Sequence, residues 1–140
     1  MTVQIAQTDD LATCLALRRQ VFIKEQGVSE AEEIDGLDST ALHLLAVDGE
    51  TPVGTARILI KGDTAKIGRV CVLRTARGTG LGAKLIEAAL GLARAQSGVT
   101  RAVLGAQVQA LGFYEKLGFA AFGPVYDDAG IDHRDMERIL

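Results

Sequence analysis

The chain opens with a short apolar run over residues 3–6, which predicts a strand, and continues with apolar residues at helical spacing. Asp9 or Asp10 can cap this helix, because a carboxylate in that position accepts hydrogen bonds from free backbone N–H groups. The buried side of the helix is expected to carry Leu11, Leu15, Val21 and Phe22. The pattern therefore predicts a strand followed by a helix.

Three runs rich in β-branched residues come next, at residues 42–47, 53–60 and 65–73. They are separated by the sequences DGE and KGD, which are typical of the tight turns in β-hairpins. Three strands joined by such turns predict an antiparallel meander.

The second half of the chain alternates helices with strands. Apolar residues at positions 81, 85, 86, 89, 92 and 93 predict a helix that ends at Ser97-Gly98. A strand is predicted over residues 101–106, a shorter helix within residues 108–119, and strand-like stretches from Phe119 and near Met136. A meander followed by helices and strands predicts an α/β fold in which a mixed sheet has helices on its faces.

The composition is that of one folded domain over residues 1–140, with 48% hydrophobic and 24% charged residues. A net charge of −3 gives no field for a polyanion, so no nucleic-acid partner is expected. The sequence predicts neither a signal peptide nor a membrane span. Cys14 and Cys71 are expected to be buried reduced thiols, which suits a cytoplasmic protein.

Residues 25–38 carry six acidic side chains and no lysine or arginine after position 24. Gly27 and Gly36 interrupt this segment, which predicts the end of a helix and a long acidic loop. Most of these carboxylates are expected to be solvated. Together they would still attract a cationic ligand.

Residues 77–82 read RGTGLG and stand between a predicted strand and a predicted helix. Backbone N–H groups of such a loop converge at the positive end of a helix dipole, a geometry that binds phosphate. A phosphate-loop NTPase is excluded because residues 83–85 lack the second glycine and the magnesium-binding hydroxyl. A dinucleotide site would use Gly78, Gly80 and Ala83, but residues 98–103 lack its acidic partner and the loop lies mid-chain.

A third pattern, [QR]xxGx[GA], is met by Arg77, Gly80 and Gly82. On this evidence the chain resembles the GNAT superfamily of acyl-CoA-dependent N-acetyltransferases over nearly its whole length. IGRVCVL resembles the fourth strand of that family, RGTGLGAKL the pyrophosphate loop and LGFYEKLGF the FYxxxGF signature. The segments VFIKEQGVSEAEEIDGLD, LGAQVQALGFYEKLGF and GIDHRDM resemble the small bacterial branch called ElaA-like or YjcF-like.

Three positions depart from the family pattern. Arg74 stands where many relatives have proline. Gly105 stands where the branch tends to have histidine, and Asp132 where it tends to have proline.

The resemblance implies a mixed, mostly antiparallel sheet of six to seven strands flanked by about four helices. It implies acetyl-CoA as co-substrate and direct acetyl transfer without an acyl-enzyme. A strand kink would free the N–H of Val72 to polarise the acetyl oxygen, and Tyr114 would lie beside the sulfur of coenzyme A. The residues that the resemblance assigns to acetyl-CoA are Val70, Cys71, Val72, Arg77, Gly78, Thr79, Gly80, Leu81, Gly82, Ala83, Gln107 and Tyr114.

The base that deprotonates the acceptor has four candidates: Glu33, His43, His133 and a water held by Gln107. Glu33 lies in EEIDG, the most family-like part of the acidic segment, and is expected to face the acceptor together with Asp35. His43 is expected to be a satisfied core histidine and His133 an exposed one. No metal site is expected, because two histidines have no clustered ligands beside them.

The sequence thus predicts an N-acetyltransferase that moves an acetyl group from acetyl-CoA to the primary amine of a small molecule. The acidic segment favours a cationic amine. The alternative is a catalytically silent domain of the same fold that senses acyl-CoA or forms a homodimer.

Overall fold

The computed structural model describes residues 2–140 and contains a seven-stranded sheet in the order β1-β2-β3-β4-β5-β7-β6. Neighbouring strands are antiparallel except for β4 and β5, which are parallel. The strands are β1 (Val3–Gln7), β2 (Leu42–Asp48), β3 (Thr51–Lys61), β4 (Thr64–Val72), β5 (Arg101–Gln107), β6 (Ala120–Asp128) and β7 (Ile131–Ile139).

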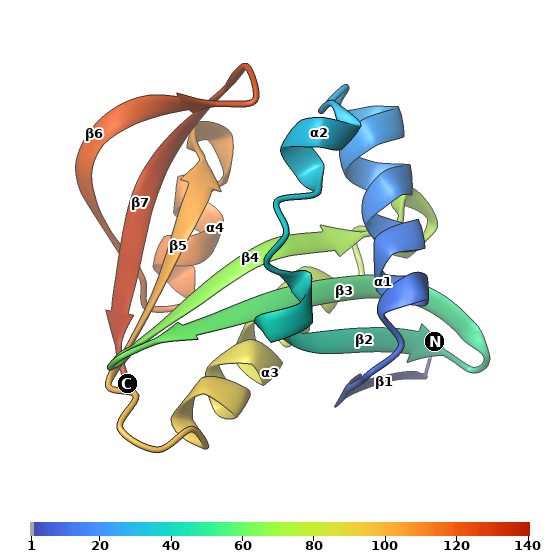
Figure 1. Ribbon diagram of the computed structural model, residues 1–140, viewed down its shortest axis with the longest axis horizontal. Helices are drawn as coiled ribbons and strands as arrows, with labels where there is room; N and C mark the ends of the chain where they lie inside the picture. The colour runs from blue at the N-terminus through green and yellow to red at the C-terminus, as the bar shows by residue number, and fades with distance from the viewer. Residues whose placement is uncertain (1) are drawn as a thin grey trace.

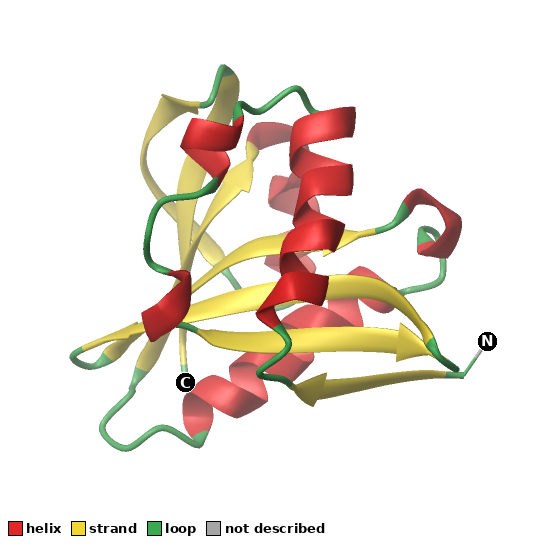
Figure 2. Ribbon diagram, turned by 45° about the vertical axis from the view of Figure 1, so that its right-hand side comes forward, coloured by secondary structure: helices red, strands yellow, loops and turns green. Residues whose placement is uncertain are grey.

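Two of the four α-helices cover opposite faces of this sheet (Figure 2). On one face Leu17 and Val21 pack against Cys71 of β4. On the other face the apolar side of the long helix α3 (Leu81–Arg94) closes the main core with β2, β3, β4 and β5. The helices are α1 (Leu11–Arg18), α2 (Glu30–Glu33), α3 (Leu81–Arg94) and α4 (Leu111–Lys116), and with the mixed sheet they confirm the predicted fold class.

The first helix buries a face that overlaps only in part with the one predicted. Asp10 caps it as expected, accepting a hydrogen bond from the N–H of Thr13 at 3.1 Å, and the chain continues as a π-helix over Arg19–Glu25. Val21 is buried as predicted and Phe22 packs beside it, whereas Leu11 and Leu15 are only partly buried. The other buried residues are Cys14, Leu17 and Arg18, so the buried face includes an arginine that the apolar pattern did not indicate.

The predicted acidic loop was partly wrong, because it contains the short helix α2 and a 3₁₀ turn over Asp38–Thr40. Ser29 caps α2 by accepting from the N–H of Glu32 at 3.2 Å and donating its hydroxyl hydrogen to the Glu32 carboxylate at 2.8 Å. The pattern S-x-x-E is that of a capping box, but here the Glu32 carboxylate accepts from the Ser29 hydroxyl and not from the Ser29 backbone N–H. The pattern is visible in the sequence, and it places the following acidic residues at fixed positions beside the sheet.

Strands β4 and β5 start side by side and then diverge (Figure 1). They pair only through residues 64–66 and 101–103. Beyond Lys66, β4 carries a β-bulge, in which Arg69 and Val70 lie opposite the single residue Ala56 of β3. Arg69 has a φ of 50°, which is unusual for a residue other than glycine. The bulge bends β4 away from β5 and opens the sheet.

The C-terminal strand is longer than predicted, since β7 begins at Ile131 and not near Met136. It pairs with β5 along its whole length and forms a hairpin with β6 through a turn at Ala129 and Gly130. The hairpin stands at the far side of the opening between β4 and β5 (Figure 1). No helix within residues 2–140 is long and apolar enough to cross a membrane.

Gly54 lets α3 approach the sheet, and its replacement by alanine is expected to destabilise the fold by about 1–3 kcal/mol. A Cβ there would lie 3.0 Å from the carbonyl oxygen of Cys71 and 3.0 Å from Leu85 Cδ1. Chemical denaturation measures this loss. Gly91→Ala on the exposed side of α3 is the control, since nothing lies within 4 Å of that site and the change should stabilise the helix by about 0.5–1 kcal/mol. Equal unfolding midpoints for the wild type and Gly54→Ala would contradict this account.

Candidate active site

The free edge of β4 presents the backbone of Val72 to the opening in the sheet. The N–H of Leu73 donates to the carbonyl of Val53 at 2.8 Å, and Val72 lies opposite Gly54 at the next position of the ladder. Successive N–H groups of an antiparallel strand point alternately toward and away from the neighbouring strand. The N–H of Val72 therefore points away from β3, on the side where β5 has diverged from β4.

The glycine loop leads directly from this edge into α3. Gly78 and Gly80 have φ values of 78° and 82°, which residues with a Cβ rarely adopt. Gly80 is the N-cap of α3, and no side chain in the described part of the chain caps the helix. The first intrahelical bond runs from the N–H of Lys84 to Gly80. The preceding N–H groups, those of Leu81, Gly82 and Ala83, are therefore directed out of the helix end, where an anion can accept from them.

The signature segment lies against the start of α3. A Cβ on Gly82 would be 3.5 Å from Cζ of Phe113, so the loop and α4 are in close contact. Tyr114 packs edge-on against Phe113 and Phe119, with ring centroids 5.0 and 6.0 Å away. Burial raises the pKa of Tyr114, so its hydroxyl stays protonated and can donate a hydrogen bond.

Three other predicted residues of the acetyl-CoA site make contacts within the protein. Arg77 donates from Nε to the carbonyl of Val72 at 3.0 Å and from Nη2 to Glu25 at 2.8 Å. The hydroxyl of Thr79 donates to the carbonyl of Ala76 at 2.7 Å. Gln107, at the end of β5, donates to the side-chain oxygen of Gln26 at 3.2 Å.

Cys71 turns its side chain toward α1, away from the main core. Burial raises the pKa of its thiol to about 12, so the sulfur stays protonated. Both cysteines are buried and free, which agrees with the expectation of packing residues. The Cys71 side chain therefore packs inside the protein and does not reach the open edge of β4.

A cavity of about 560 Å³ lies in front of the opening between β4 and β5. Its walls come from the acidic segment, from β3, from β4 up to and including the bulge, from the end of β5, from α4 and from the β6–β7 hairpin. Tyr114 and Val70 lie on one side and His133 and Tyr126 on another. A ligand in this cavity would meet β4 at Val70 and the side chain of Tyr114.

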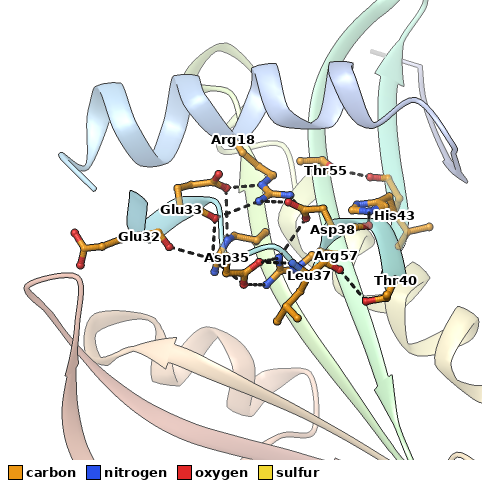
Figure 3. Close-up of polar contacts among 12 residues, drawn as sticks. Arg18, Glu32, Glu33, Asp35, Leu37, Asp38, Thr40, His43, Thr55 and Arg57 are labelled. Carbon is orange, nitrogen blue, oxygen red and sulfur yellow. Dashed lines mark hydrogen bonds and ion pairs between the residues drawn. The ribbon is translucent and has the colours of Figure 1, made fainter. Parts of the chain in front are cut away.

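Buried arginines bind the acidic segment (Figure 3). Arg18, 1% exposed, donates from Nε to Glu33 at 2.5 Å and from Nη1 to Asp38 at 2.6 Å. Arg57 holds both carboxylate oxygens of Asp35, at 2.8 and 2.9 Å. We call these side chains, together with Arg69 of the bulge, the arginine network.

The arginine network ties the bulge to the acidic segment. Arg69 donates to the backbone carbonyl of Glu33 at 3.0 Å and lies 3.3 Å from the Asp35 carboxylate. Hydrogen bonds from Arg57 hold the pKa of Asp35 well below its usual range. Burial alone would raise the pKa of Asp38, but hydrogen bonds from Arg18 and Arg57 outweigh it and lower the pKa.

This pairing changes the charge expected of the segment. Five of its six acidic side chains form ion pairs with arginines, all of which come from outside the segment. The interpretation of most of these carboxylates as free and solvated was therefore wrong. The arginines offset much of the negative charge that these carboxylates would otherwise present to the cavity.

His43 is buried, as expected, but only one of its nitrogens has a partner. Nε2 lies 2.9 Å from the carbonyl oxygen of Asp38 and donates to it, since a carbonyl only accepts. Nδ1 is buried without a hydrogen-bond partner in residues 2–140. His43 thus fixes the backbone of Asp38 and supports the arginine network.

The model of the acetyltransferase (GNAT) domain family matches residues 7–140. The chain belongs to the GNAT family. It is 39% identical to the uncharacterised N-acetyltransferase YjcF of Bacillus subtilis over 138 residues, which cover 97% of this chain and 98% of YjcF. The crystal structure of Escherichia coli ElaA matches with a TM-score of 0.87 and 30% identity over 98% of this chain and 99% of ElaA.

A third relative shares the fold alone. The PaiA N-acetyltransferase from Thermoplasma acidophilum matches with a TM-score of 0.75 and 19% identity over 100% of both chains. The resemblance to the ElaA and YjcF branch is confirmed by the first two relatives. GNAT enzymes transfer acetyl groups from acetyl-CoA, so this GNAT chain is an acyltransferase.

Sequence reasoning missed the arginines of this GNAT protein that shape the cavity. Arg18 lies at helical spacing from Cys14 and Val21, while Arg57 and Arg69 interrupt apolar strand runs. A charged residue on a predicted buried face needs a buried partner, and that was the available signal. Tyr126 and Asp135 were also missed, although Asp135 lies in the family-like segment GIDHRDM.

The arginine network should make the GNAT fold sensitive to acid. A carboxylate with a lowered folded-state pKa stabilises the fold above its unfolded pKa of about 3.9, and that contribution is lost as the pH falls through the folded-state value. Arg57→Met is expected to cost about 3–5 kcal/mol at neutral pH and less at pH 3, because below the unfolded pKa part of the gain from ionising Asp35 is already lost. Urea unfolding at both pH values measures the difference.

Arg19→Met is the matched control for this experiment, since Arg19 pairs with Glu30 on the surface. It should cost no more than about 1 kcal/mol. A cost for Arg57→Met that is the same at both pH values would show that the guanidinium contributes packing and not charge.

Proposed function

We propose that this protein transfers the acetyl group of acetyl-CoA directly to the primary amine of a small molecule. The observation that carries the proposal is the cavity at the gap between β4 and β5, which Val70 and Tyr114 line, with α4 in contact with the uncapped start of α3 through Phe113 and Gly82. A related GNAT enzyme, PaiA of Thermoplasma acidophilum, has been solved in complex with coenzyme A.

The residues of the opening fit the two ends of acetyl-CoA. The glycines at 78 and 80 leave the backbone of the loop open, since nothing lies within 4 Å of where their Cβ atoms would be. The N–H groups of Leu81, Gly82 and Ala83 would hold the pyrophosphate, with Thr79 and Arg77 beside them. The pantetheine arm would pair with β4 over Val70 to Val72 as an added strand.

The reaction needs a polarised carbonyl and a stabilised leaving group. In this proposal the N–H of Val72 donates to the acetyl oxygen, on which negative charge develops as the amine attacks. The hydroxyl of Tyr114 donates to the departing sulfur. With ordinary pKa values of about 10 for tyrosine and 8.5 for a thiol, full proton transfer to the thiolate is uphill by roughly 2 kcal/mol, so hydrogen bonding precedes proton donation.

The acceptor is proposed to be a small primary amine that enters the 560 Å³ cavity from the side of the acidic segment. Glu33, proposed from the sequence as a catalytic group, has its carboxylate bound by Arg18. A silent acyl-CoA sensor of the same fold is the alternative. Release of thiol from acetyl-CoA with a panel of amines separates the two, because a sensor binds acetyl-CoA and transfers to none of them.

Acetyl-CoA is expected to raise the melting temperature, because a ligand that binds only the native state stabilises it by RT ln(1 + [L]/Kd). Gly80→Val should abolish this rise, since valine does not adopt the φ of 82° that turns the loop into α3. Gly62→Val, at a φ of 60° in the β3–β4 turn, carries a similar backbone cost and should keep the rise. If acetyl-CoA still raises the melting temperature of Gly80→Val, the loop does not bind the pyrophosphate.

Tyr114→Phe should lower kcat by about tenfold or more while the affinity for acetyl-CoA stays nearly the same, because the hydroxyl acts on charge that develops only in the transition state. Stopped-flow or single-turnover assays establish that chemistry limits the rate, and calorimetry gives the affinity. If kcat does not change under those conditions, Tyr114 serves packing alone.

A further inference from the structure

His133 belongs to the wall of the cavity, on the hairpin that faces the open edge of β4. It pairs with Gln107 of β5 on one side and with Tyr126 of β6 on the other. It lines the same cavity as Tyr114 and Val70. A group at this place can reach an acceptor amine that enters the cavity.

The hydrogen bonding of His133 fixes which nitrogen can accept a proton. Nδ1 lies 2.7 Å from the carbonyl oxygen of Ile131. A carbonyl oxygen has no proton to give, so Nδ1 of the neutral ring carries the hydrogen and Nε2 keeps its lone pair. Nε2 is not among the buried side-chain atoms without a partner in residues 2–140, and the residue lines the cavity.

The ring of His133 is held in place by its neighbours. Tyr126 stacks on it with a centroid distance of 5.9 Å and an angle of 24° between the planes. The hydroxyl of Tyr126 donates to Asp135 Oδ1 at 2.8 Å. The Tyr126 hydroxyl can occupy this position because residue 105 is glycine. A Cβ on residue 105 would lie 2.4 Å from the Tyr126 oxygen. His133 is thus a positioned histidine and not the solvated one that the sequence suggested.

The other candidates for the base make contacts within the protein. Glu33 Oε1 accepts from Arg18 at 2.5 Å and lies 3.5 Å from Arg69, so the carboxylate is committed to an ion pair. His43 donates from Nε2, and its Nδ1 is buried. The side-chain oxygen of Gln107 accepts from Gln109 at 2.6 Å.

We propose that His133 is the general base of the acetyl transfer, an inference that rests on the function proposed above. Nε2 takes one proton from the acceptor ammonium, which becomes a neutral amine. The nitrogen lone pair forms the C–N bond to the acetyl carbon, and the C–S bond breaks with its electron pair going to sulfur. The second proton leaves the new amide nitrogen and ends on the thiolate, while His133 returns its proton to solvent.

The test uses two acceptors of the same shape and different basicity. A primary alkylamine is an ammonium ion at neutral pH and needs a base. The O-alkylhydroxylamine in which oxygen replaces the adjacent methylene is already a neutral amine. In His133→Asn, whose amide can still donate to the Ile131 carbonyl, kcat/KM for the alkylamine should fall by about 100-fold or more. For the O-alkylhydroxylamine it should change by less than about tenfold.

His133→Gln gives a second variant without the imidazole, and Asp132→Asn is the matched control beside it, expected to keep both activities. The thermal shift with acetyl-CoA shows that each variant is folded. Tyr126 is a positioning residue, so Tyr126→Phe should also lower kcat/KM more for the alkylamine than for the O-alkylhydroxylamine. The fall should be smaller than in the histidine variants. Loss of the same size for both acceptors, or no loss in either histidine variant, overturns the inference alone. Failure of the wild type to acetylate any amine overturns the proposed function as well.

Discussion

The divergence of β4 from β5 is the constraint on which the site depends. A parallel pair of strands normally continues to the ends of both strands, and here it stops after residues 64–66 have met residues 101–103. The bulge at Arg69 and Val70 turns the rest of β4 aside. The backbone groups that would have bonded to β5 are then left for a ligand, because unpaired N–H and C=O groups at such an edge need a partner. The loop, α4 and the hairpin all border the gap that results.

The arginine network fixes the acidic segment, which borders this gap, in one position. Each ion pair in it joins elements that are far apart in the chain: Arg18 from α1, Arg57 from β3 and Arg69 from the bulge bind the acidic segment. Buried ion pairs contribute little net stability, but breaking one is costly, so they select one arrangement over others. The segment is thereby a fixed wall of the cavity and not a mobile acidic loop.

The fold could be predicted from the sequence because its signals are local. The turns at Gly49 and Gly62, the apolar face of α3 and the FYxxxGF segment each depend on a few neighbouring residues. The acceptor side could not be predicted in the same way. Whether Glu33 is free or bound is decided by Arg18, and whether His133 is solvated or positioned is decided by Tyr126 and Gly105. Such contacts join distant positions, and no spacing in one sequence reports them.

The short pairing of β4 with β5 also divides the sheet into two parts that are joined by three residue pairs. One part is β1 to β4 and the other is β5, β7 and β6, and the three paired residues on each side form the pivot. Val70 and Gln107 each lie four residues beyond it, or about 13 Å along an extended strand. A rotation of about 5° at the pivot would change their separation by about 1 Å. Errors of that size cost about a hundredfold in rate when reacting groups must align. The twist of the three residue pairs that join β4 and β5 therefore sets the distance between Val70 and Gln107 across the cavity.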